Sequence, residues 1–383
     1  MMHGDSRVMV VVCLETASLP APCLSTSTSP RSREEPYFFL IGLAYGALWL
    51  GAFELWRKAP DPRLQTQAAV LMVAAGLVAP IALTADLHQP ARAWHFYAQT
   101  RFGSVMWYGA YLLPLFSLFS MLLGWLLLRP ALARRGAEGG KIARLARLLC
   151  LGDWSGKSWQ RPLSLLAALS GLSIALYTGL ETMAVAARPL WHTPWLPWLL
   201  TLSAVLGAQS ALLLLNRLLA GWGAETESTL LRQSGWTLGL LALSLLGWAL
   251  LGGASAAEAA ALYRLDPSWR LAAHWLLLTL GLAGLLMLIQ RRISARLALW
   301  GLALLGLHLV WGLRWLLLIQ GQLAPKYGAG VYLYEIAWGP AGVLGILGTF
   351  SLLVALLVAL SELVHPSASS AIKAFTTFAR EAL

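Results

Sequence analysis

Long apolar blocks separated by short polar breaks are the feature that most constrains how this sequence can fold. The clearest of them are Tyr37–Trp56, Leu71–Thr84, Met106–Leu128 and Leu344–Leu360. A helix that crosses the hydrocarbon core of a bilayer needs ~20 mostly apolar residues. Only 12% of the residues are charged, about half the share typical of soluble proteins. The sequence therefore predicts an all-α integral membrane protein.

The same length rule predicts about nine transmembrane helices along the chain. They cover roughly residues 36–56, 66–88, 103–129, 161–186, 193–216, 233–253, 270–290, 296–320 and 334–363. Lys and Arg are richer in the first, third, fifth and seventh connections and in the tail. Because such residues favour the cytoplasmic side, we expect the N-terminus outside and the C-terminus in the cytoplasm. The odd number of spans agrees with this.

The expected domain organisation follows from these spans. Residues 1–35 are rich in Ser and Pro and are interpreted as a disordered leader or as the result of a start codon assigned too early. Residues 36–363 form the polytopic membrane domain, and residues 364–383 form a cytoplasmic tail. Small residues, such as Gly42 and Gly46 in the first span and Gly342, Gly345 and Gly348 in the last, predict close helix packing.

Composition excludes several classes of function. The net charge is +11, but the basic residues cluster in loops between apolar spans, which argues against a nucleic-acid partner. The three cysteines, Cys13, Cys23 and Cys150, form no CxxC or CxxCH motif. We therefore expect no covalent haem, iron–sulfur cluster or other metal site in this chain. No phosphate-binding loop, HExxH or GxSxG occurs, and the loops are too short for a soluble catalytic domain.

Polar residues in or near the predicted spans gather towards the outer side. Asp86 and His88 end the second span, and His95 follows in the outer loop. Tyr177 and Glu181 lie in the outer half of the fourth span, four residues apart and so on one helix face. A carboxylate inside a span is by default a hypothesis of function. Apolar walls with a few convergent polar groups suit a small amphipathic ligand such as a quinone.

These residues also have plainer interpretations. Asp86 is equally compatible with a loop cap, and His95 with a structural histidine at the membrane surface. Arg314 and Glu335 are compatible with an ion pair that joins two helices. A non-covalent haem would need two histidines at similar depth, whereas His274 and His308 differ by roughly two helical turns, on the order of 10 Å. The haem alternative is therefore disfavoured.

Several motifs resemble the NrfD/PsrC family, the membrane subunits of polysulfide-reductase-like complexes. Pro36–Ala44 reads PYFFLIGLA, Asp86–His95 reads DLHQPARAWH, and Gly103–Trp107 reads GSVMW. The most specific block joins Tyr177–Gly179 to RPLW at Arg188–Trp191 across an outer loop. Towards the C-terminus, residues 320–330 and 345–350 are similar to the membrane subunits of tetrathionate reductases. Two segments depart from the pattern: residues 34–37 lack a polar Asn and His pair, and Pro340–Ala341 replaces an Asp-containing turn.

The resemblance implies a function and its partners. It implies the quinol-oxidising membrane anchor of a periplasm-facing respiratory reductase for tetrathionate or a related sulfur compound, in the bacterial inner membrane. The expected partners are a ferredoxin-like iron–sulfur subunit and a molybdopterin catalytic subunit, and the expected electron donor is menaquinol. Tyr177 matches the family's quinone-facing tyrosine.

The expected roles of the site residues follow. Tyr177 donates a hydrogen bond to a quinone oxygen, Asp86 or Glu181 accepts the proton, and His88 or His95 relays it outward. Arg188, Trp191 and Arg314 complete the expected quinone-binding set, the two arginines chiefly by fixing loops and helix pairs. Two alternatives stay open. A transporter is disfavoured because no inverted repeat is evident and polar groups gather at one face; a purely structural anchor predicts that Tyr177 and Glu181 are dispensable.

Overall fold

The computed structural model describes residues 34–86, 90–98, 101–152, 154–218, 223–290, 292, 295–323, 338–339 and 342–364. Within these ranges the chain is helical and forms no strand, and nine helices are long and apolar enough to cross a membrane. They are α1 (Glu34–Trp56), α2 (Pro62–Asp86), α4 (Val105–Gly136), α6 (Lys157–Met183), α7 (Trp195–Leu218), α8 (Ala224–Leu251), α10 (Pro267–Ile289), α11 (Ala295–Arg314) with its continuation η2 (Trp315–Gln320), and α13 (Val343–Val364). The predicted fold class is confirmed.

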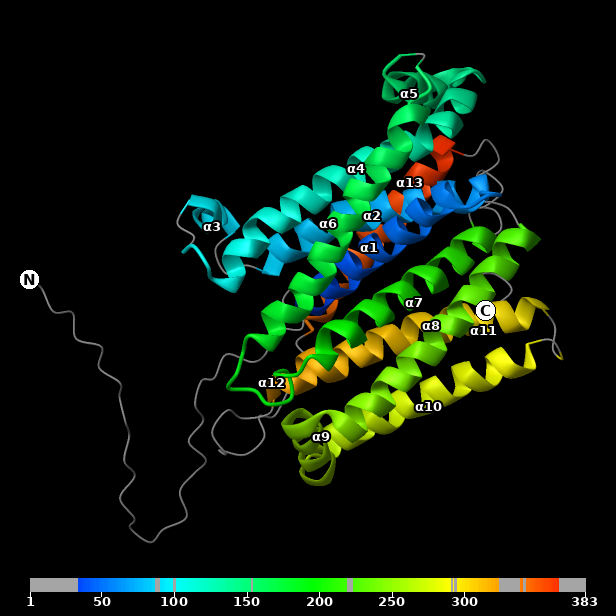
Figure 1. Cartoon of the computed structure of the whole chain (residues 1–383). Helices are drawn as coiled ribbons and strands as arrows, with labels where there is room; N and C mark the ends of the chain where they lie inside the picture. Colours follow the sequence, from blue (N-terminus) through cyan, green and yellow to red (C-terminus); the bar gives the residue numbers. More distant parts are fainter. Residues whose placement is uncertain are drawn as a thin grey trace, which may run out of the picture.

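The first eight long helices form two four-helix bundles (Figure 1). In the first bundle each of α1, α2, α4 and α6 packs against the next, and α6 closes the ring on α1. In the second bundle α7, α8, α10 and α11 pack in the same cyclic order. Helix α13 packs outside the first bundle, against α2 and α4. The expected four-helix bundle among the early spans is therefore present, and a second one with the same order follows it.

Short helices lie at the ends of the long ones. At one end are η1 (Pro90–Arg92) and α3 (His95–Ala98), which join α2 to α4, and α9 (Gly253–Leu265), which joins α8 to α10. At the opposite end α5 (Gly140–Cys150) joins α4 to α6. A further short helix, α12 (Gly321–Leu323), directly follows η2. Helix α4 extends seven residues beyond its predicted end at 129, because the basic residues that follow continue the helix out of the apolar zone.

Close packing of α1 on α7 joins the two bundles. A Cβ added at Gly46 would lie 2.8 Å from the carbonyl oxygen of Ala204 and 2.8 Å from the Cβ of Ala208. Such approach of two helix backbones is possible only where side chains are minimal. The packing role predicted for the glycines of the first span is confirmed. At Gly348 in α13 no described atom lies within 4 Å, so the same expectation is wrong there.

Polar side chains fasten the bundles together at the end where α1 meets α2. The Glu54 carboxylate is fully buried and accepts hydrogen bonds from Arg57 Nη1 at 2.8 Å and from the Asp61 backbone N–H at 3.0 Å. Thr226 of α8 donates to Asp61 Oδ2 at 2.5 Å. Gln67 of α2 donates to Asn216 of α7 at 3.1 Å. These bonds connect the two bundles. Glu54 has a structural role, because its carboxylate accepts the hydrogen bonds of the loop between α1 and α2.

Some predictions lie outside the described residues. His88, Glu335, Pro340–Ala341, residues 1–33 and the tail from 365 onward belong to this group. The orientation of the termini across the membrane also stays a prediction, because it rests on the charge distribution of the loops.

Candidate functional site

Tyr177 and Glu181 occupy the last two turns of α6, as their spacing predicts. The Tyr177 side chain is buried and its hydroxyl is hydrogen-bonded to the Glu181 carboxylate, which is half-buried. The ring sits directly on Gly109 of α4, where an added Cβ would collide with the Tyr177 hydroxyl. Gly109 is therefore required for the position of Tyr177, because any side chain there would displace the hydroxyl from its place between α4 and α6.

Tyr37 of α1 completes the cluster. Its side chain is buried, it interacts electrostatically with Glu181, and it also lies near Tyr97 of α3. Tyrosines of α1 and α6 thus approach one half-buried carboxylate, with Gly109 of α4 against Tyr177 and Tyr97 of α3 near Tyr37. Tyr37 belongs to one of the family motifs in the sequence, but the motif alone predicts no role for it. Its position one residue inside the first span, on the same predicted side as Glu181, was the available signal.

Arg314 lies between the two bundles beside this cluster. It is the largest side chain that is essentially fully buried, with 1% of its surface exposed. Nη1 donates to the carbonyl oxygen of Phe38 at 2.6 Å, and Nη2 donates to that of Leu200 at 2.9 Å. It passes over Gly42, where an added Cβ would lie 2.8 Å from Nη2. Arg314 therefore fixes a helix pair, as expected, and its Phe38 contact lies one residue from Tyr37.

Arg188 and Trp191 hold the loop between α6 and α7. Arg188 Nη1 donates to the carbonyl oxygen of Gly321 at 2.6 Å, and its guanidinium lies 5.0 Å from the centre of the Trp191 ring. Trp191 Nε1 donates to the carbonyl oxygen of Leu317 at 2.6 Å. Both acceptors belong to η2 or its first following residue, where the wide π-helical turn alters the usual backbone pairing. These contacts give Arg188 and Trp191 a loop-fixing role, and quinone contact stays a prediction for both.

The remaining predicted site residues are less closely tied to the cluster. Asp86 is the last residue of α2, but its side chain lies outside the described set, as does all of His88. His95 begins α3, is half-buried, and packs edge-on against Trp94 with ring centres 3.9 Å apart. Among the described residues, no hydrogen bond joins His95 to Tyr177 or Glu181. Its relay role stays a prediction.

The two histidines considered for haem have aromatic partners. His274 Nε2 lies 2.6 Å from the Tyr263 hydroxyl, and His308 Nε2 accepts from Trp275 Nε1 at 2.5 Å. The two histidines therefore bond to different aromatic side chains. In the described part of the chain, no group of three or more His, Cys, Asp or Glu residues is arranged to hold a metal ion.

The fold and the cluster define a class of protein, namely a multi-pass membrane protein with a polar site at one end of its first helical bundle. Residues 36–326 match the polysulphide reductase NrfD family. Because this match extends over more than half of the chain, the protein belongs to that family. The resemblance carried by its sequence motifs is thereby confirmed.

Two relatives place the protein within the family. It is 33% identical over 335 residues to the C subunit of tetrathionate reductase from Salmonella typhimurium, covering 85% of this chain and 89% of the relative. It is 28% identical over 199 residues to the C chain of polysulfide reductase from Wolinella succinogenes, covering 50% of this chain and 59% of the relative. Both relatives are parts of reductases, which supports a membrane-anchor role in a reductase complex.

Proposed function

We propose that the chain is the quinol-oxidising membrane subunit of a respiratory reductase complex, with Tyr177 and Glu181 at its site. The single observation that carries this proposal is the hydrogen-bonded pair itself. A tyrosine hydroxyl and a carboxylate lie together at one end of an apolar bundle, where Gly109 leaves room for the tyrosine ring. A buried hydroxyl with a defined partner can orient a ligand oxygen, and an adjacent carboxylate can accept a proton.

The chemistry assigned to these residues is proton transfer coupled to quinol oxidation. A quinol that is oxidised to quinone releases two electrons and two protons. Glu181 accepts protons from the quinol hydroxyl groups, one at a time, and passes them to water at the nearby surface. Tyr177 donates a hydrogen bond to the ligand oxygen in place of its bond to Glu181. Tyr37 adds a second buried tyrosine near the carboxylate.

The electrons leave to a partner subunit in this proposal. Both relatives are named as parts of reductases, and the residues described here offer no metal site that could store electrons. An iron–sulfur partner that docks at the Tyr177 end would lie within reach of the quinol. We further propose menaquinol as the donor, a molybdopterin catalytic partner, a sulfur compound such as tetrathionate as the terminal acceptor, and the bacterial inner membrane as the location.

The test uses the intact complex with Tyr177→Phe and Glu181→Gln. The measurement is reduction of the partner's iron–sulfur clusters by a menaquinol analogue, normalised to assembled complex. Matched controls are Tyr263→Phe and Glu258→Gln, which change a tyrosine and a carboxylate of α9 at the same end of the second bundle. We expect roughly 10²-fold loss for the Glu181 variant and a smaller loss for the Tyr177 variant, with the controls unchanged.

Unchanged turnover in both site variants would reject this site and leave a purely structural anchor. Loss of assembly without loss of turnover per complex would lead to the same conclusion. Equal losses in the variants and their controls would show that the measurement reports damage to the fold.

A further inference from the structure

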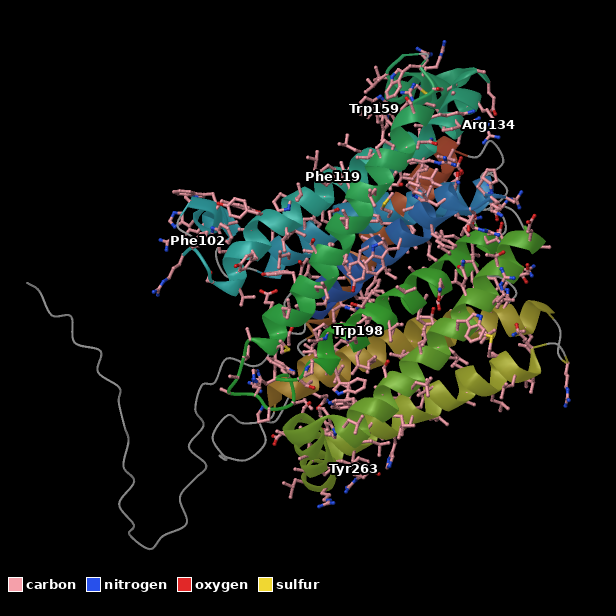
Figure 2. All side chains as sticks on the ribbon, viewed as in Figure 1. Phe102, Phe119, Arg134, Trp159, Trp198 and Tyr263 are labelled. Atoms are coloured by element: carbon pink, nitrogen blue, oxygen red, sulfur yellow. The ribbon has the colours of Figure 1, made fainter. Side chains whose placement is uncertain are left out.

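A cavity of about 660 Å³ lies at the end of the molecule opposite the Tyr177 cluster. It is enclosed by the end of α4, by α5 and by the loop that leads into α6. Arg129, Arg147 and Lys157 line it, and the described lining residues include no carboxylate. The surrounding segment, residues 129–161, carries eight Lys or Arg and two acidic residues. The cavity is therefore a site of strong positive charge. Figure 2 labels Arg134 and Trp159 at this end, and Phe102 at the other.

Helix α5 has three faces of different chemistry. Residues at spacings of three and four face α4 and are buried, namely Ala143, Ala146 and Cys150. A second face exposes large apolar side chains, with Ile142 40%, Leu145 46% and Leu149 38% exposed. A third face carries Lys141, Arg144 and Arg147. A short helix with exposed apolar and basic faces is typical of a segment lying in the membrane interface.

The floor of the cavity is held rigidly by Arg129. Its side chain is buried, and its guanidinium lies beside two indoles that also contact each other, 5.1 Å from the ring centre of Trp125 and 4.3 Å from that of Trp154. The same group donates to the carbonyl oxygens of Cys150 and Trp154 and to that of Gly152 at 3.0 Å. No described carboxylate pairs with it. Arg129 thus positions the loop and adds a positive charge beneath the cavity.

Two further cations stand at the accessible rim. The Arg147 stem crosses the end of α4, where a Cβ added at Gly136 would lie 2.5 Å from its Cγ. Arg147 and Lys157 are both exposed, so their charged groups are free to meet a ligand. The exposed indoles of Trp154 and Trp159, 45% and 63% accessible, place this region at the depth where tryptophans border a membrane.

We propose that this cavity binds the headgroup phosphate of an anionic phospholipid, with its acyl chains lying along Ile142, Leu145 and Leu149. The charge of the cavity complements a phosphate, and the adjoining apolar face complements the acyl groups. Basic pockets between helices at the membrane surface are known to suit anionic headgroups such as those of cardiolipin. The inference is independent of the proposed quinol chemistry, because it uses the opposite end of the molecule.

The test measures lipid binding to the purified full-length protein. The double variant Arg147→Gln/Lys157→Gln removes the rim cations and keeps Arg129. The control double variant Lys58→Gln/Arg292→Gln removes the same two charge types from exposed turns at the same end, outside the cavity. Native mass spectrometry then compares retention of tetraoleoyl cardiolipin with that of dioleoyl phosphatidylcholine. A further arm adds inorganic phosphate against chloride at matched ionic strength.

The expected result is a roughly 10- to 30-fold loss of cardiolipin affinity in the cavity variant. Phosphatidylcholine retention stays unchanged, and the control variant stays within about twofold of wild type. Arg147→Lys, which keeps the charge, retains most of the binding and shows that the loss is not a folding defect. Equal cardiolipin losses in both double variants, or no loss in either, would overturn the proposal. Displacement of cardiolipin by phosphate but not by chloride would instead assign a site for soluble anions.

Discussion

The two four-helix bundles share a helix order but differ in what their helices contain. In the first bundle, Tyr37, Tyr177 and Glu181 converge at one end. In the second, the described interior holds amides and hydroxyls such as Gln209 and Thr237, together with the buried Arg314. Helices α8 and α10 of the second bundle also leave most of their surface uncovered. The difference shows that two bundles with the same helix order can hold different polar groups, and the proposed function rests on those of the first bundle.

Hydroxyl groups of the second bundle are largely satisfied within their own helices. Ser203 donates to the carbonyl oxygen of Leu200 at 2.9 Å, and Thr279 donates to that of Leu276 at 2.9 Å. Such bonds meet the needs of a polar group in hydrocarbon without directing it at a ligand. The comparison can be tested by changing equivalent features in each bundle.

The largest expected effect comes from a methyl group at Gly109. Gly109→Ala puts a Cβ on the Tyr177 hydroxyl, so the tyrosine must leave its position. We expect a roughly 10- to 100-fold loss of quinol-driven reduction per assembled complex, because small misplacements at a reacting site are costly. The matched change in the second bundle is Gly239→Ala, where no described atom lies within 4 Å. A similar loss in both variants would erase the proposed difference between the bundles.

The next effect concerns the junction of the bundles. Arg314→Met removes the hydrogen bonds to the carbonyls of Phe38 and Leu200, which tie α11 to α1 and α7. We expect the free energy of unfolding to fall by about 2 kcal/mol, since charged hydrogen bonds are partly offset by the cost of burying the charge. Arg314→Lys should recover little of the lost free energy of unfolding, because one ammonium group cannot reach both acceptors as a guanidinium does.

Thermal unfolding of the full-length protein in detergent, followed by tryptophan fluorescence, measures this effect. Arg270→Met, at an exposed site in α10, is the control. An unchanged midpoint for Arg314→Met would show that the bundles are held by apolar packing alone.

A smaller effect is expected at Glu54. Glu54→Ala removes the acceptor of Arg57 and of the Asp61 N–H, at a cost of about 1–3 kcal/mol. The same contact raises the pKa of the Arg57 guanidinium, chiefly through the hydrogen bond from Arg57 to the Glu54 carboxylate. Quinol oxidation per complex should not change, because Glu54 lies about 25 Å along α1 from Tyr37. The exposed Glu225→Ala is the stability control. Loss of turnover in assembled Glu54→Gln would give this residue a role beyond the loop.

The smallest effect is predicted inside the second bundle. Gln209→Leu removes a 3.1 Å hydrogen bond to Thr237, but Thr237 keeps its 3.0 Å bond to the Gln233 carbonyl. The side-chain Oε1 of Gln209 is buried and has no hydrogen-bond partner among the described residues, so its removal favours the folded state. Interhelical hydrogen bonds in membranes average about 0.6 kcal/mol. We therefore expect unfolding free energy and turnover to stay near wild type, measured in the same two assays. A large loss would show that the second bundle's polar pairs matter as much as those of the first.

The fold was predictable because its signal is local. Each span is marked by its own apolar block, and Gly42 with Gly46 marks the α1–α7 contact. The pairing of Tyr177 with Glu181 was predictable for the same reason, since both lie on one helix. Gly109 and Tyr37 come from other helices, and only their spatial arrangement joins them to the site. The bonds of Arg188 and Trp191 to residues more than 120 positions away carry no sequence signal.

The π-helical stretch Trp315–Gln320 has a consequence for the direction of the segment that follows it. Each of its turns holds about one residue more than an α-helical turn. Winding the same residues as an ordinary α-helix, at about 100° per residue, would rotate Gly321–Leu323 by about 100° relative to the helix that precedes them. The Leu317 and Gly321 carbonyls would then point away from Trp191 and Arg188. The π-helical winding therefore sets the direction of the Leu317 and Gly321 carbonyls. The bonds of these carbonyls to Trp191 and Arg188 constrain the number of residues in the stretch.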